Sequence, residues 1–181
     1  MRKKRGEKPE IQKQKKEIIS VLLRYITLII FGIFLSLFYK IFFVLTIWPS
    51  FFLLNIFYNA SVVGNLILIN GLTIEIISAC VAGSAYYLLL ILNLTTRIKI
   101  KKRVYSLIFS FSSLLLLNIL RIFFLSVLFV RRFAFFDITH KLLWYVLSII
   151  FVIGIWFLTS WIFKIKEIPI YSDIKRIVNS F

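Results

Sequence analysis

Three kinds of residue are scarce in this chain of 181 residues, and each scarcity excludes a class of protein. A single cysteine, Cys80, cannot form an internal disulfide, which excludes a disulfide framework and leaves the redox compartment open. One histidine and seven scattered acidic residues argue against a metal site built from several His, Cys, Asp and Glu ligands, and no cofactor is expected. The length leaves no room for a separate soluble catalytic domain.

Apolar residues, by contrast, are abundant. They make up 61% of the chain, and charged residues only 17%. A soluble domain is about half apolar and rarely contains runs of about 20 apolar residues. The composition therefore predicts an integral membrane protein.

The charge that is present is of one sign and is clustered. The chain carries 23 Lys and Arg and a net charge of +16, and 17 of these basic residues fall within 1–16, 97–103 and 164–181. Short basic segments remain on the cytoplasmic side during membrane insertion. Because orientation explains the three clusters, no nucleic-acid partner is expected. Residues 1–20 and 164–181 are interpreted as cytoplasmic tails.

Four apolar stretches predict transmembrane helices within a membrane domain that covers residues 21–163. An even number of crossings separates the basic clusters, so the segments 40–78 and 131–141 are expected outside. The predicted spans are 21–39, 79–96, 104–130 and 142–163.

The outer segment 41–78 is expected to contain two elements. Residues 41–58 are apolar enough to span, but a crossing there would expose the basic 97–103 loop, so they predict a helix lying at the outer interface. Pro49 marks its expected start. Residues 65–77 contain Asn70-Gly71 between β-branched apolar runs, which predicts a β-hairpin. The predicted fold is an all-α, four-span helical bundle with an interfacial helix and a small outer hairpin.

Three residues that hydropathy alone would not select lie at a similar predicted depth. Cys80, Arg121 and His140 are separated from the nearest cytoplasmic cluster by helical lengths of about 26, 27 and 36 Å. All three therefore fall near the outer surface of a hydrocarbon core about 30 Å thick. The sequence predicts that three different segments bring these side chains to one level.

These residues could form an acyl-transfer site. A cysteine in the first turn of a helix is favoured as a thiolate, and a guanidinium nearby would stabilise that thiolate or an oxyanion. Histidine could carry the proton between the thiol and the leaving amine. The structural alternatives are inert packing for Cys80, a snorkelling side chain for Arg121 and an interfacial polar residue for His140.

Three further residues are candidates for a supporting role. Gly83 lies on the Cys80 face and would leave room for a substrate backbone. Asn118 lies one turn before Arg121, where it could orient the guanidinium or bond another helix. Glu75, on the second hairpin strand, either faces solvent or contacts substrate.

Three blocks of sequence contain these candidate residues, namely Ile77-Ser-Ala-Cys80-Val-Ala-Gly83, Asn118-Ile-Leu-Arg121-Ile and Thr139-His140. In this order they resemble the nucleophile block, the Asn-x-x-Arg-Ile block and the terminal histidine block of the exosortase/archaeosortase family of membrane cysteine transpeptidases. The resemblance covers residues 60–163 approximately. The chain departs from the family in lacking a serine directly after the cysteine, and it is shorter than the larger members.

The resemblance implies a multi-pass enzyme of a prokaryotic cell membrane, with its active site on the extracytoplasmic side. Its partners would be secreted proteins that end in a short motif, an apolar helix and a basic tail, and a membrane or surface acceptor. Cys80 would be the nucleophile, Arg121 would stabilise the oxyanion or thiolate, and His140 would be the acid and base, a role that Arg131 or Arg132 could share.

Two other functions remain open. A small channel or scaffold would use Arg121 for pairing and leave Cys80 inert. A lipid or acyl transferase would use the same cysteine on a different substrate.

Overall fold

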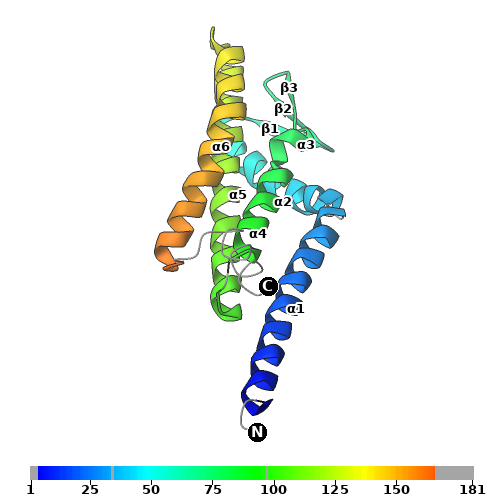
Figure 1. Ribbon diagram of the computed structural model, residues 1–181. Helices are drawn as coiled ribbons and strands as arrows, with labels where there is room; N and C mark the ends of the chain where they lie inside the picture. Colours follow the sequence, from blue (N-terminus) through cyan, green and yellow to red (C-terminus); the bar gives the residue numbers. More distant parts are fainter. Residues whose placement is uncertain (1–3, 34, 97, 166–181) are drawn as a thin grey trace.

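The computed structural model describes residues 4–33, 35–96 and 98–165, with side chains from residue 19 onward. Arg97 and nearly all of the predicted tail 164–181 lie outside the described residues. The described chain is mostly helical and contains one small sheet, in agreement with the predicted class of helical membrane protein (Figure 1). Three of its helices are long and apolar enough to cross a membrane: α2 (Leu35–Phe57), α5 (Ile100–Val130) and α6 (Phe136–Ile162).

The predicted first and second spans correspond to shorter apolar stretches. The first is Ile19–Ile33, the end of α1 (Lys4–Ile33), and the second is Ser78–Leu94. At about 1.5 Å per residue, these stretches measure roughly 22 and 25 Å, less than a hydrocarbon core of about 30 Å.

Helices α5 and α6, the two longest of the three candidate spans, pack side by side. At about 1.5 Å per residue they reach roughly 46 and 40 Å, more than the hydrocarbon thickness. Inside the pair, the Ser110 and Thr159 hydroxyls share a buried hydrogen bond of 2.9 Å. At one end, Lys102 Nζ donates to the Lys164 carbonyl at 3.4 Å, so the start of α5 and the end of α6 lie at one level.

Helix α6 begins six residues before the predicted start at 142. The predicted outer loop 131–141 is therefore wrong in its second half, which is helical. Asp137 in the first turn suits the positive end of the helix dipole, and Phe136 stacks on His140 one turn later. Both effects favour the early start.

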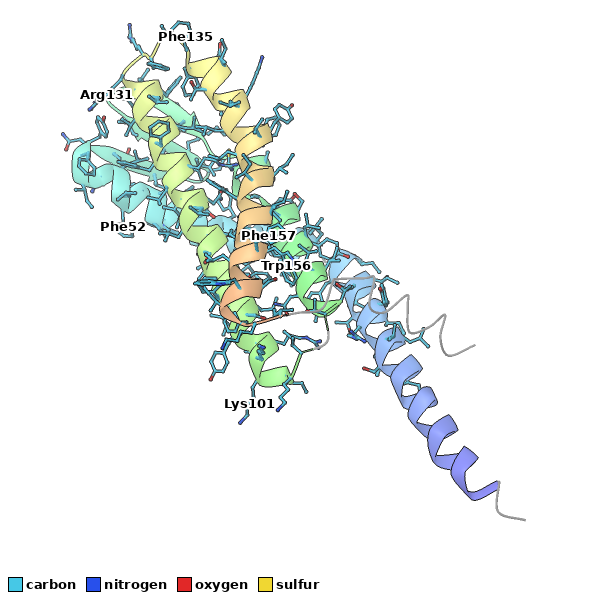
Figure 2. The ribbon with its side chains drawn as sticks, turned by 60° about the vertical axis from the view of Figure 1, so that its left-hand side comes forward. Phe52, Lys101, Arg131, Phe135, Trp156 and Phe157 are labelled. Carbon is cyan, nitrogen blue, oxygen red and sulfur yellow. The ribbon has the colours of Figure 1, made fainter. Side chains whose placement is uncertain are left out.

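Helix α2 differs from its prediction in its start. The helix begins at Leu35, so the predicted span 21–39 is wrong at its end, and Pro49 lies inside the helix instead of starting it. In Figures 1 and 2, α2 runs obliquely across α5 instead of alongside it. Phe52 is 60% exposed, and Figure 2 shows it on the side of α2 away from α6.

The small sheet has three strands where two were predicted. Strands β1 (Ala60–Val63), β2 (Leu66–Ile69) and β3 (Leu72–Glu75) are antiparallel in the order β1-β2-β3. Asn70 and Gly71 have φ values of 50° and 76°, which confirms the predicted Asn-Gly turn. The unpredicted β1 joins through Gly64, whose φ is 63°. One face of the sheet packs on α2 through a cluster of buried apolar residues, comprising Ile47, Leu54, Ile67, Ile69, Ile76 and Ile122.

The predicted span 79–96 is interrupted just after the cysteine. Helix α3 (Ser78–Val81) ends at Ala82, which is left-handed with φ 57° and ψ 36°, and α4 (Gly83–Leu94) follows. A Cβ on Gly83 would lie 2.7 Å from the Tyr39 ring. The prediction that Gly83 leaves room for substrate is therefore wrong, because Tyr39 of α2 occupies that space.

Different elements lie at the two ends of the molecule. The starts of α1 and α5 lie at one end, while the sheet lies toward the other (Figure 1). Figure 2 shows Lys101 and Arg131 at opposite ends of α5. The basic residues at the start of α5 are thus separated from the sheet by much of the length of this helix.

Candidate active site

A cleft lies between strand β3 and helices α3, α5 and α6. It consists of two adjoining cavities of about 230 and 170 Å³. Residues from all four elements line both cavities, namely Glu75, Cys80, Ile122, Leu125 and His140. Arg121 and Trp144 line the smaller cavity. The structure therefore brings the three predicted catalytic residues, from three different helices, to one cleft.

Cys80 is held through its own backbone. The left-handed Ala82, two residues after the cysteine, ends α3, and the Cys80 carbonyl faces α5. There the carbonyl accepts hydrogen bonds from Asn118 Nδ2 at 2.8 Å and Arg121 Nη2 at 3.2 Å. The Cys80 side chain is half-buried and lines both cavities. Of the two roles predicted for Asn118, the structure shows the bond to another helix.

Arg121 joins three helices at the cleft. Its side chain is only 7% exposed, so the guanidinium does not snorkel outward. Besides the Cys80 carbonyl, it donates from Nη1 to the Ser148 hydroxyl of α6 at 2.7 Å. A guanidinium has five N–H donors, and these two bonds leave others for a further acceptor. The positive charge is therefore fixed next to the residue that carries the thiol.

His140 lies on the α6 wall of the cleft. Its ring stacks on Phe136, with 5.7 Å between ring centroids and 6° between planes. The residue is exposed and lines both cavities with Cys80. An imidazole in this position is accessible to a bound substrate and to water.

The remaining predicted residues separate into two groups. Glu75 lines both cavities, and its Oε1 accepts a hydrogen bond from Asn65 Nδ2 at 3.0 Å. Its side chain is exposed, so it faces solvent and the cleft at once. Arg131 and Arg132 are also exposed, but neither is among the described residues that line the two cavities.

Sequence analysis missed two residues of this site, Trp144 and Ser148. Both follow His140 at intervals of four, which places all three on one face of a helix. That spacing was available in the sequence. A serine inside an apolar span carries no functional signal of its own, because small polar residues are common between membrane helices.

The groups that meet here suit acyl transfer. A thiol can attack a carbonyl, a cation can hold the resulting negative charge, and an imidazole can move the proton. Among the described residues, no group of three or more His, Cys, Asp and Glu could hold a metal ion. In comparisons with family models, curated proteins and solved structures, none matches this chain.

Proposed function

We propose that this protein is a membrane-embedded cysteine transpeptidase that cleaves C-terminal sorting signals of secreted proteins and transfers them to a membrane or surface acceptor. One observation carries the proposal. Cys80, Arg121 and His140 reach one cleft from three helices, and Arg121 is hydrogen-bonded to the backbone of the cysteine itself. The resemblance of their sequence blocks to the exosortase/archaeosortase family supports the same function.

The reaction begins when His140 takes the thiol proton and Cys80 Sγ attacks the scissile carbonyl carbon. The carbonyl electron pair moves onto oxygen, and the Arg121 guanidinium stabilises the oxyanion. When the oxyanion collapses, the C–N bond breaks and the departing amine receives the proton from His140. A thioester on Cys80 remains.

The second half of the cycle releases the thioester. An acceptor hydroxyl, amine or water attacks its carbonyl carbon and gives a proton to His140. The C–S bond then breaks and the Cys80 thiolate is restored as the new acyl bond is completed. Arg121 acts in both halves, because a tetrahedral oxyanion forms in each.

The proposed topology places the cleft outside and the basic segments inside a prokaryotic cell membrane. The apolar parts of α1, α3 with α4, α5 and α6 make four crossings, and α2 lies at the outer interface. The start of α5 and the sheet lie toward opposite ends of the molecule, which supports this arrangement. A substrate tail helix with a basic end would pack in the same orientation and present its motif to the cleft.

The test is processing of a secreted reporter that ends in a motif, an apolar helix and an Arg/Lys tail, taken from the genome that encodes this chain. Cys80→Ser is expected to lower processing by about a thousandfold or more, since the nucleophile is lost. Arg121→Ala should lower it by roughly a hundredfold or more, because oxyanion stabilisation is lost. Cleavage would be followed as the size shift of the reporter in membranes.

Lys141→Ala is the control for Arg121→Ala, because it removes an exposed cation that is not among the described residues lining the two cavities. It should process the reporter normally. Unchanged processing in Cys80→Ser would disprove the transpeptidase and leave a scaffold or channel. A lipid trapped as a thioester on Cys80, in place of a peptide, would instead indicate a lipid or acyl transferase.

A further inference from the structure

Strand β3 has one paired edge and one edge that no described strand covers. It lies at the end of the sheet order and pairs with β2 alone. The Ile76 N–H donates to the Asn65 carbonyl at 2.9 Å, so the backbone groups of Ile76 point toward the β2 side. Backbone direction alternates along an antiparallel ladder. The N–H and C=O groups of Thr73 and Glu75 therefore point away from β2.

This edge forms a wall of the cleft. Residues 73–76 all line the larger cavity, together with Cys80. The facing wall, from α5 and α6, is mainly apolar and includes Leu125, Phe129 and Phe136. The edge thus presents backbone donors and acceptors that no described strand pairs, beside an apolar wall, and such an edge is a template for a further strand. A ligand that offers alternating C=O and N–H groups would satisfy them, and an extended peptide has that pattern.

The negative charge of Glu75 in the cleft indicates the chemistry of one side chain of such a peptide. Glu75 is the only acidic residue among those that line the two cavities. Its carboxylate accepts one hydrogen bond from Asn65 Nδ2 and keeps further acceptor capacity. A basic or hydrogen-bond-donating side chain opposite Glu75 would be complementary to it.

We infer that the free edge of β3 binds the recognition segment of the substrate as an added strand, paired to Thr73 and Glu75 and leading to Cys80. This inference rests on the proposed function, whose substrate it describes as an extended peptide with a basic or donor residue opposite Glu75. Main-chain pairing would supply binding, and Glu75 would supply selectivity.

Disulfide capture tests this geometry without catalysis. Cys80 is the only cysteine, so Cys80→Ser leaves a chain without thiols, and Thr73→Cys then adds one at the edge. The probe is a synthetic tail peptide with about ten residues of alternating Thr and Val around one Lys. An apolar helix of about 20 residues and an Arg/Lys end follow. A single cysteine is moved through the first segment, one position per peptide.

Ser61→Cys in the Cys80→Ser chain is the matched control. Ser61 lies opposite Leu68, which lies opposite Thr73, so the control thiol sits in the same row two strands away. Both positions are exposed. The full-length variants would be compared in lipid bilayers under the same mild oxidant.

With Thr73→Cys, capture should alternate along the probe and be roughly tenfold stronger at every second position, because successive side chains of a strand point to opposite faces. N-methylation of the alternate probe amides that would pair with β3 should remove this pattern. Capture that is uniform along the probe, absent, or equally strong with Ser61→Cys would overturn the inference. Because this experiment uses the Cys80→Ser chain, its result is independent of whether Cys80 performs acyl transfer.

Discussion

Among the described residues, the Arg121 guanidinium of α5 is bonded to α3 and α6 through two hydrogen bonds. An arginine within a membrane span costs about 2.5–3.5 kcal/mol on insertion scales, so its hydrogen bonds must offset part of that cost. One of them, to Ser148, positions the guanidinium without contacting the cysteine. The other, to the Cys80 carbonyl, couples its position to the nucleophile.

Ser148→Ala should therefore impair the site while leaving the charge in place. Loss of one bond to a charged donor is worth about 1.5–3 kcal/mol, part of which water can replace. We expect reporter processing to fall by roughly three- to thirtyfold. Ser112→Ala is the control, because Ser112 is exposed on α5. Equal processing by the two variants would show that Ser148 does not position Arg121.

The sequence alone indicated Arg121 as a candidate site residue, but it did not indicate Ser148, the hydroxyl that Arg121 bonds. Arg121 is conspicuous because an arginine is rare within an apolar helix. Asn118 could be associated with it by helical spacing. Ser148 lies 27 residues away in sequence from Arg121, and only the packing of α5 on α6 brings the two together.

The break between α3 and α4 is the element that orients the site. Ala82 adopts a left-handed conformation that non-glycine residues rarely hold without tertiary support. Support comes from α2, since Tyr39 packs directly over Gly83. Helix α5 therefore holds Cys80 before the break, through hydrogen bonds to its carbonyl, and α2 packs against Gly83 after the break.

Gly83→Ala should lower the stability of the protein, because the clash of the new Cβ with Tyr39 opposes the gain in helix propensity. The added Cβ would lie within 3 Å of three Tyr39 ring atoms, so the ring must move, at a cost of about 1–3 kcal/mol. At about 2–4 °C per kcal/mol, thermal unfolding in detergent, followed by tryptophan fluorescence, should shift down by several degrees.

Gly154→Ala is the matched control, because nothing lies within 4 Å of its added Cβ in α6. Helix propensity should leave the midpoint of that variant unchanged or slightly raised. A Gly83→Ala chain that unfolds at the midpoint of the original protein would show that Tyr39 does not hold the break.

Helices, strands and turns could be predicted where neighbouring residues in the sequence carry a signal for them. The Asn70-Gly71 turn has one, because both residues tolerate positive φ, and long apolar runs indicated α5 and α6. Strand β1 was missed because four residues after a helix carry little periodicity. The break at Ala82 was missed because alanine is a strong helix former, and its conformation comes from tertiary contacts.

For the whole molecule, the direction of α2 decides the number of crossings. Hydropathy alone makes α2 a candidate span, and it cannot distinguish a helix that crosses the membrane from one that lies against it. The charge distribution gives a criterion. If α2 crossed the membrane, the N-terminal basic cluster and the basic 97–103 segment would lie on opposite sides, against the rule that both stay in the cytoplasm. The oblique path of α2 across α5 is compatible with the proposed arrangement, in which both remain inside (Figure 1).

Labelling of single cysteines from each side of the membrane measures on which side the N-terminal cluster and the 97–103 segment lie. In the Cys80→Ser chain, Lys101→Cys and Glu7→Cys should both resist a membrane-impermeant maleimide in intact cells and react after permeabilisation. Ser61→Cys, exposed on β1, should react in intact cells and shows that the reagent reaches the outer face. If α2 crossed the membrane, Lys101→Cys and Glu7→Cys would lie on opposite sides, and only one of them would be protected. That result would place either the N-terminal cluster or the 97–103 loop outside, and the four-crossing topology would have to be abandoned.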